Sequence, residues 1–532
     1  MIDKISVVNN KQQHTPRRDN YSQNPSFNGL GDGIISAVQL CEKYPMVNVS
    51  ALDLSTAIVP RTIIETKESN GHAGFEAFRR ESSGLIVNCL IPSFIVMGIA
   101  KLLQRPLMGS FNKSNLVNTW ANGDSIDKVH YFYGNAKGST PKERVSNTFR
   151  NMLNSISGAD GDKTKEFSEI FKNNPKFEKA VQDLTDAVMS EKPNSKAVKK
   201  AYEALVNETH IAENIRFKND KGFFANNLES VCDDTVKMLR GIIKENITDQ
   251  KQLADYFKKA KKLVNWKSIG GLGVIIPLAI SMQPINRWIT RKTSGQKGAP
   301  IYKDFGKDNE HKELTPKEKR ELLAQKFISI GSMVGVAGLS MFMDRPSLKM
   351  FQFKGLFPTM DQARIISTAT FASRMGAAED KNELREATVR DIATFASFYF
   401  LGDYVAKGIA TLLEKKNKGV HLINTLEKPK EGANALQKFW HWAKHTTIKS
   451  SDELATAKDK KLRTICQIGN IVFSLLALGV FIPLYTRSKT NKKHAEELAK
   501  MNAEKGQTET PADDFTKSFL KDKTAFHAFT HS

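Results

Sequence analysis

The sequence predicts a mostly helical, multi-pass membrane protein that contains an internal duplication, with an all-helical soluble domain inserted into the first copy. Three observations support this fold class. Short apolar phrases recur in the same order in the two halves of the chain. Several uncharged runs are long enough to cross a bilayer, and a long polar segment between two of them has helical periodicity. These patterns define architecture more closely than activity.

The recurring phrases are the basis for the duplication. Leu272–Leu278 reads LGVIIPL and Leu478–Leu484 reads LGVFIPL, so six of seven positions match. Gly98–Leu103 (GIAKLL) likewise recurs as GIATLL at Gly408–Leu413. Three weaker landmarks keep the same order: Ile63–Thr66 with Ile365–Thr368, Arg80-Glu81 with Arg385-Glu386, and Pro45 with Pro346. Five colinear pairs predict a repeated structural unit.

The apolar runs differ in strength. Ile465–Tyr485 has 21 residues without a charge, which spans a ~30 Å hydrocarbon core at about 1.5 Å per residue. Three further uncharged runs are Ser82–Ala100, Ile269–Ile285 and Phe327–Met343. The run Ile392–Leu413 is the weakest, because two charged residues interrupt it. We therefore expect four or five spanning helices.

A sixth segment, Leu30–Met46, is the repeat mate of Phe327–Met343 but carries three charged residues. We expect it to lie at the interface or to pack inside the protein. The alternative for the whole set is a soluble helical protein with buried apolar helices. That alternative is disfavoured because a soluble core helix usually has a polar face, and Ile465–Tyr485 has almost none.

These patterns divide the chain into seven segments. Their boundaries are 1–27 (disordered tail), 28–111 (membrane repeat one, first part), 112–262 (helical insertion), 263–290 (membrane repeat one, second part), 291–323 (linker), 324–490 (membrane repeat two) and 491–532 (polar C-terminal tail). Within the insertion, Thr140–Glu143 (TPKE) is a capping box with proline at the first helical position. Helices are expected over 163–173, 175–190, 194–214, 222–246 and 248–263, separated by helix-start signals.

The net charge of +22 favours contact with anionic head groups of a lipid bilayer. The basic segments match no specific nucleic-acid motif. The first 27 residues lack an apolar core of signal-peptide length, so a cleavable signal peptide is not expected. With five spans, the excess of Lys and Arg in loops 290–325 and 414–461 would place the N-terminus in the cytoplasm and the insertion on the opposite side.

Candidate functional residues lie in or beside the apolar runs. Asp403 and Lys407 are one helical turn apart, and we expect them to pair and to face other helices, because charges at membrane depth are costly. Asn88, like Gln467 and Asn470, could hydrogen-bond between helices. Helix kinks are expected at Pro92, Pro277 and Pro483. Gly331 and Gly335 form a Gly-x-x-x-Gly motif that permits close helix packing.

No catalytic motif, cofactor-binding loop or metal-ligand set is recognisable, so we expect no enzyme activity and no cofactor. His441 and His445 have ligand-like spacing, but two ligands do not make a zinc site. Two functional hypotheses remain. In the first, a membrane-embedded scaffold or anchor presents the helical insertion to a protein partner. In the second, the chain is a transporter or channel built from two repeats with kinked helices.

Overall fold

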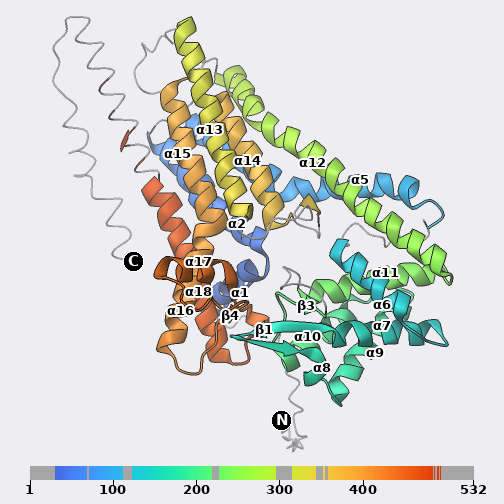
Figure 1. Ribbon diagram of the computed structural model, residues 1–532. Coiled ribbons are helices and arrows are strands. Elements are labelled where there is room, and N and C mark those ends of the chain that lie inside the picture. Colours follow the sequence, from blue (N-terminus) through green and yellow to red (C-terminus); the bar gives the residue numbers. More distant parts are fainter. Residues whose placement is uncertain are drawn as a thin grey trace, which may run out of the picture.

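The computed structural model describes residues 30–68, 71–111, 123–218, 227–294, 314–342, 351–353 and 358–482, with a few isolated positions up to 496. The predicted tail at 1–27, the predicted tail at 491–532 apart from residues 492 and 496, and the kink at Pro483 lie outside the described residues. The described chain is mostly helical and forms two parts, a tall helical bundle and a smaller mixed domain beside its lower end (Figure 1).

The bundle is built from long helices and short π-helical segments. Its α-helices are α1 (Leu30–Lys43), α2 (Pro45–Asp53), α3 (Val59–Glu68), α4 (Gly71–Leu85), α5 (Ile91–Met108), α12 (Gln250–Ser294), α13 (Pro316–Phe342), α14 (Met360–Ala377), α15 (Lys381–Ala396), α16 (Gly402–Lys416) and α18 (Ala457–Leu476). The π segments are η1 (Leu54–Ile58), η2 (Ile86–Leu90), η5 (Ser397–Leu401) and η7 (Ala477–Phe481). The first three join α2 to α3, α4 to α5 and α15 to α16.

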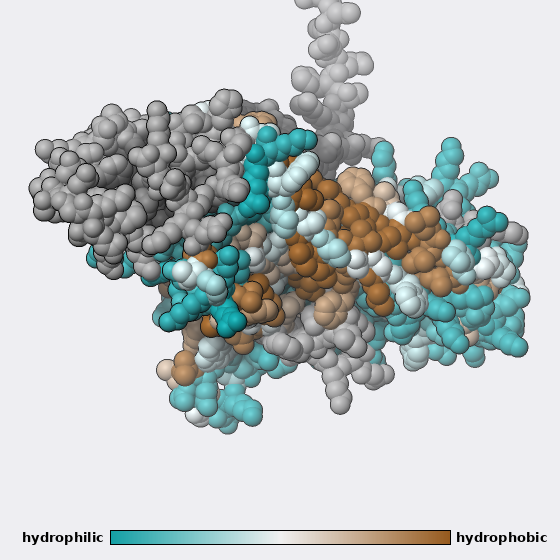
Figure 2. Space-filling view, turned by 90° about the horizontal axis from the view of Figure 1, so that it is seen from above, coloured by the Kyte–Doolittle hydropathy of each residue, from teal (hydrophilic) through white to brown (hydrophobic). Residues whose placement is uncertain are grey.

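Four stretches of helix in the described residues are long and apolar enough to cross a membrane. They are Gly74–Met108, Gln250–Thr293, Pro316–Met341 and Ala457–Phe481. Large apolar side chains on these helices are exposed, as for Phe94 (66%) and Phe327 (69%). Figure 2 shows hydrophobic residues gathered in one broad area, with hydrophilic residues around it. The weakest predicted run, Ile392–Leu413, is not among the four.

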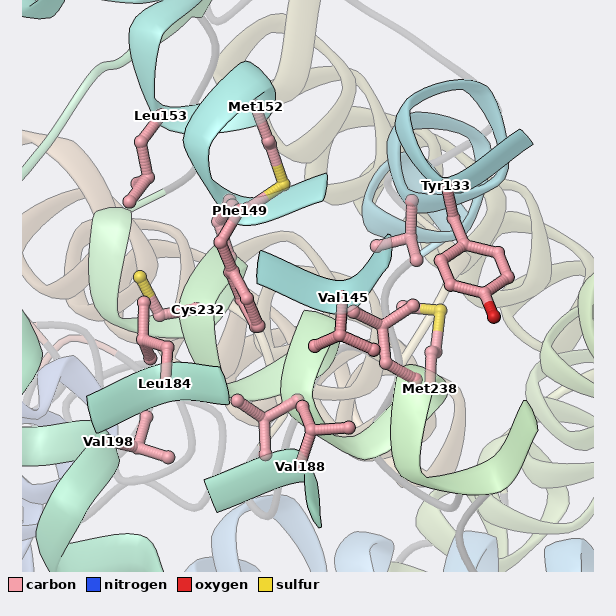
Figure 3. Packing of buried hydrophobic residues seen from close by; sticks show 14 of the residues in the cluster. Tyr133, Val145, Phe149, Met152, Leu153, Leu184, Val188, Val198, Cys232 and Met238 are labelled. Atoms are coloured by element: carbon pink, nitrogen blue, oxygen red, sulfur yellow. The ribbon is translucent and has the colours of Figure 1, made fainter. Parts of the chain in front are cut away.

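The inserted domain has its own hydrophobic core. Its helices are α6 (Gly123–Asn135), α7 (Pro141–Asn154), α8 (Phe167–Ile170), α9 (Pro175–Met189), α10 (Ser195–Thr209) and α11 (Leu228–Lys244). Phe149 and Met152 from α7 meet Leu184 from α9 and Cys232 from α11 in this core (Figure 3). Half of the predicted capping box forms at Thr140, whose side chain accepts from the amide of Glu143. The Glu143 carboxylate accepts instead from the amide of Ser139.

The prediction that the insertion is all-helical was wrong. It contains a three-stranded sheet of β1 (Ile156–Asp160), β2 (Lys163–Glu166) and β3 (Arg216–Phe217), in the order β2-β1-β3. The helix expected at 163–173 is instead β2 followed by the single turn of α8. The reason is the Gly161-Asp162 turn, in which Gly161 adopts φ +66°. Glycine supplies the positive φ that a two-residue hairpin requires.

The separate helix expected at 248–263 was also wrong. Nothing breaks the chain before the apolar run, so α12 continues for 45 residues, a length of about 68 Å. Its first part places Leu253 and Tyr256 in the core of the insertion. Its second part places Ile275 and Ala279 in the core of the bundle. One helix is therefore shared between the two cores.

The insertion also docks on the loop between α16 and α18. This loop forms β4 (Ile423–Thr425), α17 (Ala435–His445) and β5 (Thr446–Ile448). The amide of Thr425 donates to the carbonyl of Gly161 at 2.7 Å, and the amide of Gly161 donates to Oδ1 of Asn424 at 2.8 Å. Lys449 forms an ion pair with Asp160, which lies next to that turn.

This docking corrects the predicted topology. Hydrogen-bonded groups cannot lie on opposite sides of a bilayer, so the insertion and loop 414–461 share one side. The sequence placed them on opposite sides because it counted Ile392–Leu413 as a fifth crossing. If only the four helices that qualify by length and composition crossed a membrane, the chain would return to the insertion's side before this loop. The contact and the count of four agree.

The docking contact depends on charge. Burial alone would raise the pKa of Asp160, but hydrogen bonds from Lys165 and Lys449 hold that pKa below its usual range. A carboxyl whose pKa is lower in the folded state stabilises that state above its unfolded pKa, which is about 3.9 for Asp. The stabilisation is lost as the pH falls through the folded value. The docking contact should therefore weaken in acid.

We predict that Lys449→Met loosens the docking selectively. A hydrogen bond to a charged group is worth roughly 1.5–3 kcal/mol, so the amide of Thr425 should exchange its hydrogen about 10- to 150-fold faster. Hydrogen-exchange mass spectrometry of the purified full-length protein measures this rate. Lys428→Met, which removes an exposed lysine of the same loop, serves as the matched control and should leave the rate unchanged. Equal rates in both variants would contradict the assignment.

Candidate functional site

The interior of the bundle is polar around one helix, α14. It packs against α12, α13 and α15, and it contacts η2. Buried polar residues of α14 include Gln362, Ser367 and Thr370. Such residues need partners when they are buried, and α14 finds them on its neighbours. The apolar helices therefore surround a polar centre.

Asn88 makes the interhelical hydrogen bond expected from the sequence. The hydroxyl of Thr370 donates to Oδ1 of Asn88 at 2.8 Å, which joins α14 to η2. Gln467 on α18 likewise donates to Oδ1 of Asn48 on α2 at 3.2 Å. Both contacts join segments that are far apart in the sequence. Polar residues in the apolar runs thus hold the bundle together.

A cluster of buried charges lies at the end of the bundle away from the insertion. Arg61 Nη1 lies 2.7 Å from Glu81 Oε1, and Arg374 Nη1 lies 2.8 Å from Asp391 Oδ1. Arg374 also reaches across, with Nη2 3.6 Å from Oε2 of Glu81. Asp391 is 1% exposed and Glu81 is 7% exposed. We call Arg61, Arg80, Glu81, Arg374, Arg390 and Asp391 the charge cluster.

Two further arginines complete the cluster in the same way. Arg80 Nε lies 3.3 Å from Glu81 Oε1, and Arg390 Nε lies 3.3 Å from Asp391 Oδ1. In each case the arginine directly precedes the acid in the sequence. Four cations thus surround two buried acids, which offsets the cost of burying each carboxylate. The arrangement suits a structural clasp between helices.

Sequence reasoning missed most of this cluster. Its residues lie outside the apolar runs, so a search for charges within those runs did not find them. Arg80-Glu81 was noticed only as a repeat landmark, and it was paired with Arg385-Glu386. Arg385 is exposed, whereas Arg390 and Asp391 occupy the site. The usable signal was Arg390-Asp391, which directly precedes the run Ile392–Leu413 as Arg80-Glu81 precedes Ser82–Ala100.

A second set of ion pairs closes the same end of the bundle. Arg287 Nη1 lies 3.2 Å from Glu379 Oε1, and Arg287 also pairs with Glu383. Arg291 pairs with Glu379 as well. These contacts join the last turns of α12 to the start of α15 and the turn before it. Together with the charge cluster they join five helices: α3, α4, α12, α14 and α15.

The expectation that Asp403 faces other helices was wrong, whereas its pairing with Lys407 stays a prediction. Asp403 is exposed in the first turn of α16, so it does not face other helices. Ala406 and Ala410 take the inward face instead. Lys407 is half-buried; its Nζ donates to the carbonyl of Ala443 on α17 at 3.0 Å and lies 5.1 Å from the ring centroid of Tyr404. Asn88 lies in η2, where it accepts from Thr370 of α14.

The prolines produce no break in the assigned helices. Pro92 is buried at the start of α5, directly after η2, where the wider π segment precedes a residue that has no amide hydrogen to donate. Pro277 is exposed within α12, which continues through it and through Pro284. The helix is therefore not broken at Pro277, the first proline of the predicted pair. The second, Pro483, lies outside the described residues.

Gly331 and Gly335 are exposed on α13, and a Cβ atom added at either would meet nothing within 4 Å. No described part of this chain packs against them. Helix packing through this motif therefore stays a prediction, and its partner would be another molecule. His441 and His445 stack on each other at 4.4 Å between ring centroids. The described residues hold no group of three or more His, Cys, Asp or Glu side chains that could bind a metal ion.

Comparison with protein-family models, with curated proteins and with solved structures finds no match to this chain. Function must therefore be argued from the geometry of the chain itself.

We predict that Arg374→Met destabilises the bundle strongly, because Arg374 is the one member of the charge cluster that contacts both acids. Removing one partner of a buried ion pair costs about 3–5 kcal/mol. Unfolding of the purified protein in mixed micelles by added sodium dodecyl sulfate measures this change. Arg385→Met on the exposed side of α15 is the matched control and should shift the free energy of unfolding by less than ~0.5 kcal/mol. If the two variants unfold alike, the cluster does not stabilise the fold.

Proposed function

We propose that the chain is an integral membrane scaffold in which two copies of one helical unit hold the inserted domain at the membrane surface. The proposal assigns the chain no catalytic role. The observation that carries it is that the bundle is closed at both ends, by ion pairs at one end and by the docked insertion at the other. The insertion then presents its free surface to a protein partner.

The order of elements supports two copies of one unit. In the first copy α4, η2 and α5 follow one another, and in the second copy α15, η5 and α16 do so. Each series leads to a polar domain or loop and then to a long apolar helix, α12 or α18. In both copies the GIA helix packs on that long helix: Ile99 lies against Gly270, and Ile409 lies against Gly469.

The two copies also exchange contacts in a similar way. Helix α14 of the second copy packs on α12 of the first, and α2 of the first copy packs on α18 of the second. Such reciprocal packing is what an approximate two-fold relation between the copies would produce. Neither unit would then bury its inner face without the other.

The charge cluster indicates how the two copies align in sequence. GIAKLL and GIATLL are 310 positions apart, and the same shift carries Arg80-Glu81 onto Arg390-Asp391. Both pairs make the same contact at 3.3 Å. This register replaces one of the sequence landmarks, because Arg390-Asp391 takes the place of Arg385-Glu386.

Closure at both ends favours a scaffold over a transporter. A transporter that rocks one repeat against the other must separate the repeats at each end in turn. Here Arg374 of the second copy contacts Glu81 of the first at the far end. At the near end the insertion of the first copy docks on the loop of the second through Asp160 and Lys449. Opening either end would leave charges without their partners.

Exposed apolar area supports the membrane over the soluble alternative. At most a third of each spanning window is buried inside the protein. Leu102 is 76% exposed and Leu339 is 68% exposed. A monomeric protein in water rarely exposes large contiguous apolar patches, whereas lipid covers them at no cost.

One observation favours transport as the second candidate. Asp391 Oδ2 is buried and has no hydrogen-bond partner among the described residues. A buried acid with an unsatisfied oxygen can mark an ion or proton site within a membrane protein. In that function the charge cluster would exchange partners during a transport cycle.

We predict one rigid state under all ion and pH conditions. Spin labels are placed at the far end on Lys292→Cys and Lys381→Cys, and at the near end on Lys163→Cys and Lys428→Cys, all exposed sites. In reconstituted protein each pair should give a single distance distribution by pulsed electron resonance, with and without Na⁺ and at acid or neutral pH. Two distances that change in opposite senses at the two ends would favour the transporter and overturn the scaffold.

A simpler measurement tests membrane integration itself. The protein expressed in cells should stay in the membrane pellet after alkaline carbonate extraction. Cysteines at Lys163 and Lys428 should then react with an impermeant reagent from the same side of sealed vesicles. Release into the supernatant would favour the soluble alternative.

A further inference from the structure

Helix α17 carries an apolar stripe that the chain covers only at one end. Leu436, Phe439, Trp440 and Ala443 follow the i, i+3, i+4, i+7 spacing of one helix face. Ala443 is buried, whereas Leu436 is 64%, Phe439 54% and Trp440 53% exposed. The helix starts at a complete capping box formed by Asn434 and Gln437, so its exposed part is a stable helix. Its free face needs an occupant.

The anchored end of α17 fixes the position of this helix along the long axis of the bundle. Trp442 Nε1 donates to the hydroxyl of Thr411 at 3.2 Å, and Lys407 donates to the carbonyl of Ala443. The α17 helix is therefore tied to residues 407–411 of α16. At this height α16 packs on α18, where Ala410 meets Cys466 in one buried cluster.

The same height is where the lipid-facing surface of α18 begins. Ile465, Ile468, Val472 and Leu476 are exposed on successive turns of α18. Their spacing gives one apolar stripe along the helix, and Ile465 is next to Cys466. Toward the insertion, before residue 463, α18 instead carries Lys458, Lys460 and Lys461. Helix α17 thus lies at the boundary between the apolar belt and the polar end of the bundle.

The charges around α17 match an anionic surface. Between 414 and 445 the chain has seven lysines and three glutamates. All seven lysines are exposed: Lys415, Lys416, Lys418, Lys428, Lys430, Lys438 and Lys444. Each lysine near an anionic leaflet adds to the attraction toward it. An exposed apolar stripe with aromatic residues beside lysines is typical of a helix that lies in the plane of the interface.

We propose that α17 is an interfacial helix that inserts Leu436, Phe439 and Trp440 into a leaflet of anionic phospholipid, with the seven lysines on its head groups. This rests on the proposed membrane function. The α17 proposal goes beyond that function by naming the segment that binds anionic lipid. It also places the membrane surface directly beside the hairpin of β4 and β5 on which the insertion docks.

The test uses spin labels in the full-length protein, reconstituted in phosphatidylcholine vesicles with and without phosphatidylserine. A label on Leu436→Cys should become accessible to oxygen and protected from a water-soluble nickel complex when phosphatidylserine is present. Replacing Lys438 and Lys444 together with Gln should reduce that protection several-fold. Tyr131→Cys, an equally exposed site on the insertion, is the matched control and should stay accessible to nickel in every vesicle.

A label on Val472→Cys separates the two proposals. If Val472 is protected by lipid and Leu436 remains in water, the membrane function holds and the α17 proposal is overturned. If both sites are in water, the membrane function itself fails. If Leu436 is protected from nickel equally with and without phosphatidylserine, the proposed preference for anionic lipid is overturned. A label–label interaction between two copies at Leu436, with no oxygen access, identifies a second copy as the occupant and overturns the lipid.

Discussion

The one unbroken helix α12 is the constraint on which the rest of the structure depends. Because Tyr256 lies in the core of the insertion and Ile275 in the core of the bundle, neither core can move without bending the same helix. Helix α12 is continuous between these two residues, and no proline lies between them. The insertion is thus held against the bundle, and its docking on the hairpin of β4 and β5 costs little further ordering.

The sequence was most informative where one physical effect dominates. Ile465–Tyr485 was identified because nothing but an apolar environment suits such a run, and Thr140–Glu143 because a cap is a local contact. It was least informative where distant partners decide. The start of the segment 163–173 is a strand because β1 pairs with residues 163–166, and the charge cluster forms because four segments of low hydropathy meet. Neither depends on a pattern within one segment.

The candidate site illustrates the same limit. Asp403 and Lys407 stood out because they interrupt an apolar run, but the helix continues past them to Lys416, with Asp403 exposed and Lys407 half-buried against α17. Arg374 and Asp391 did not stand out, because their surroundings in the sequence are polar. Burial of a charge is a property of the assembled bundle: Asp391 is buried only because α14 supplies Arg374. A duplication makes such a site easier to find, since its members should occur twice.

Charge and position also link the two surfaces of the loop between α16 and α18. One surface, at Asn424 and Lys449, binds the insertion, and the other is the stripe of α17. If α17 rests on an anionic leaflet, the insertion lies on that same side of the membrane. Anionic lipid is concentrated on the cytoplasmic leaflet, so the insertion would face the cytoplasm. The free buried thiols of Cys89, Cys232 and Cys466 are compatible with that compartment, where thiols stay reduced.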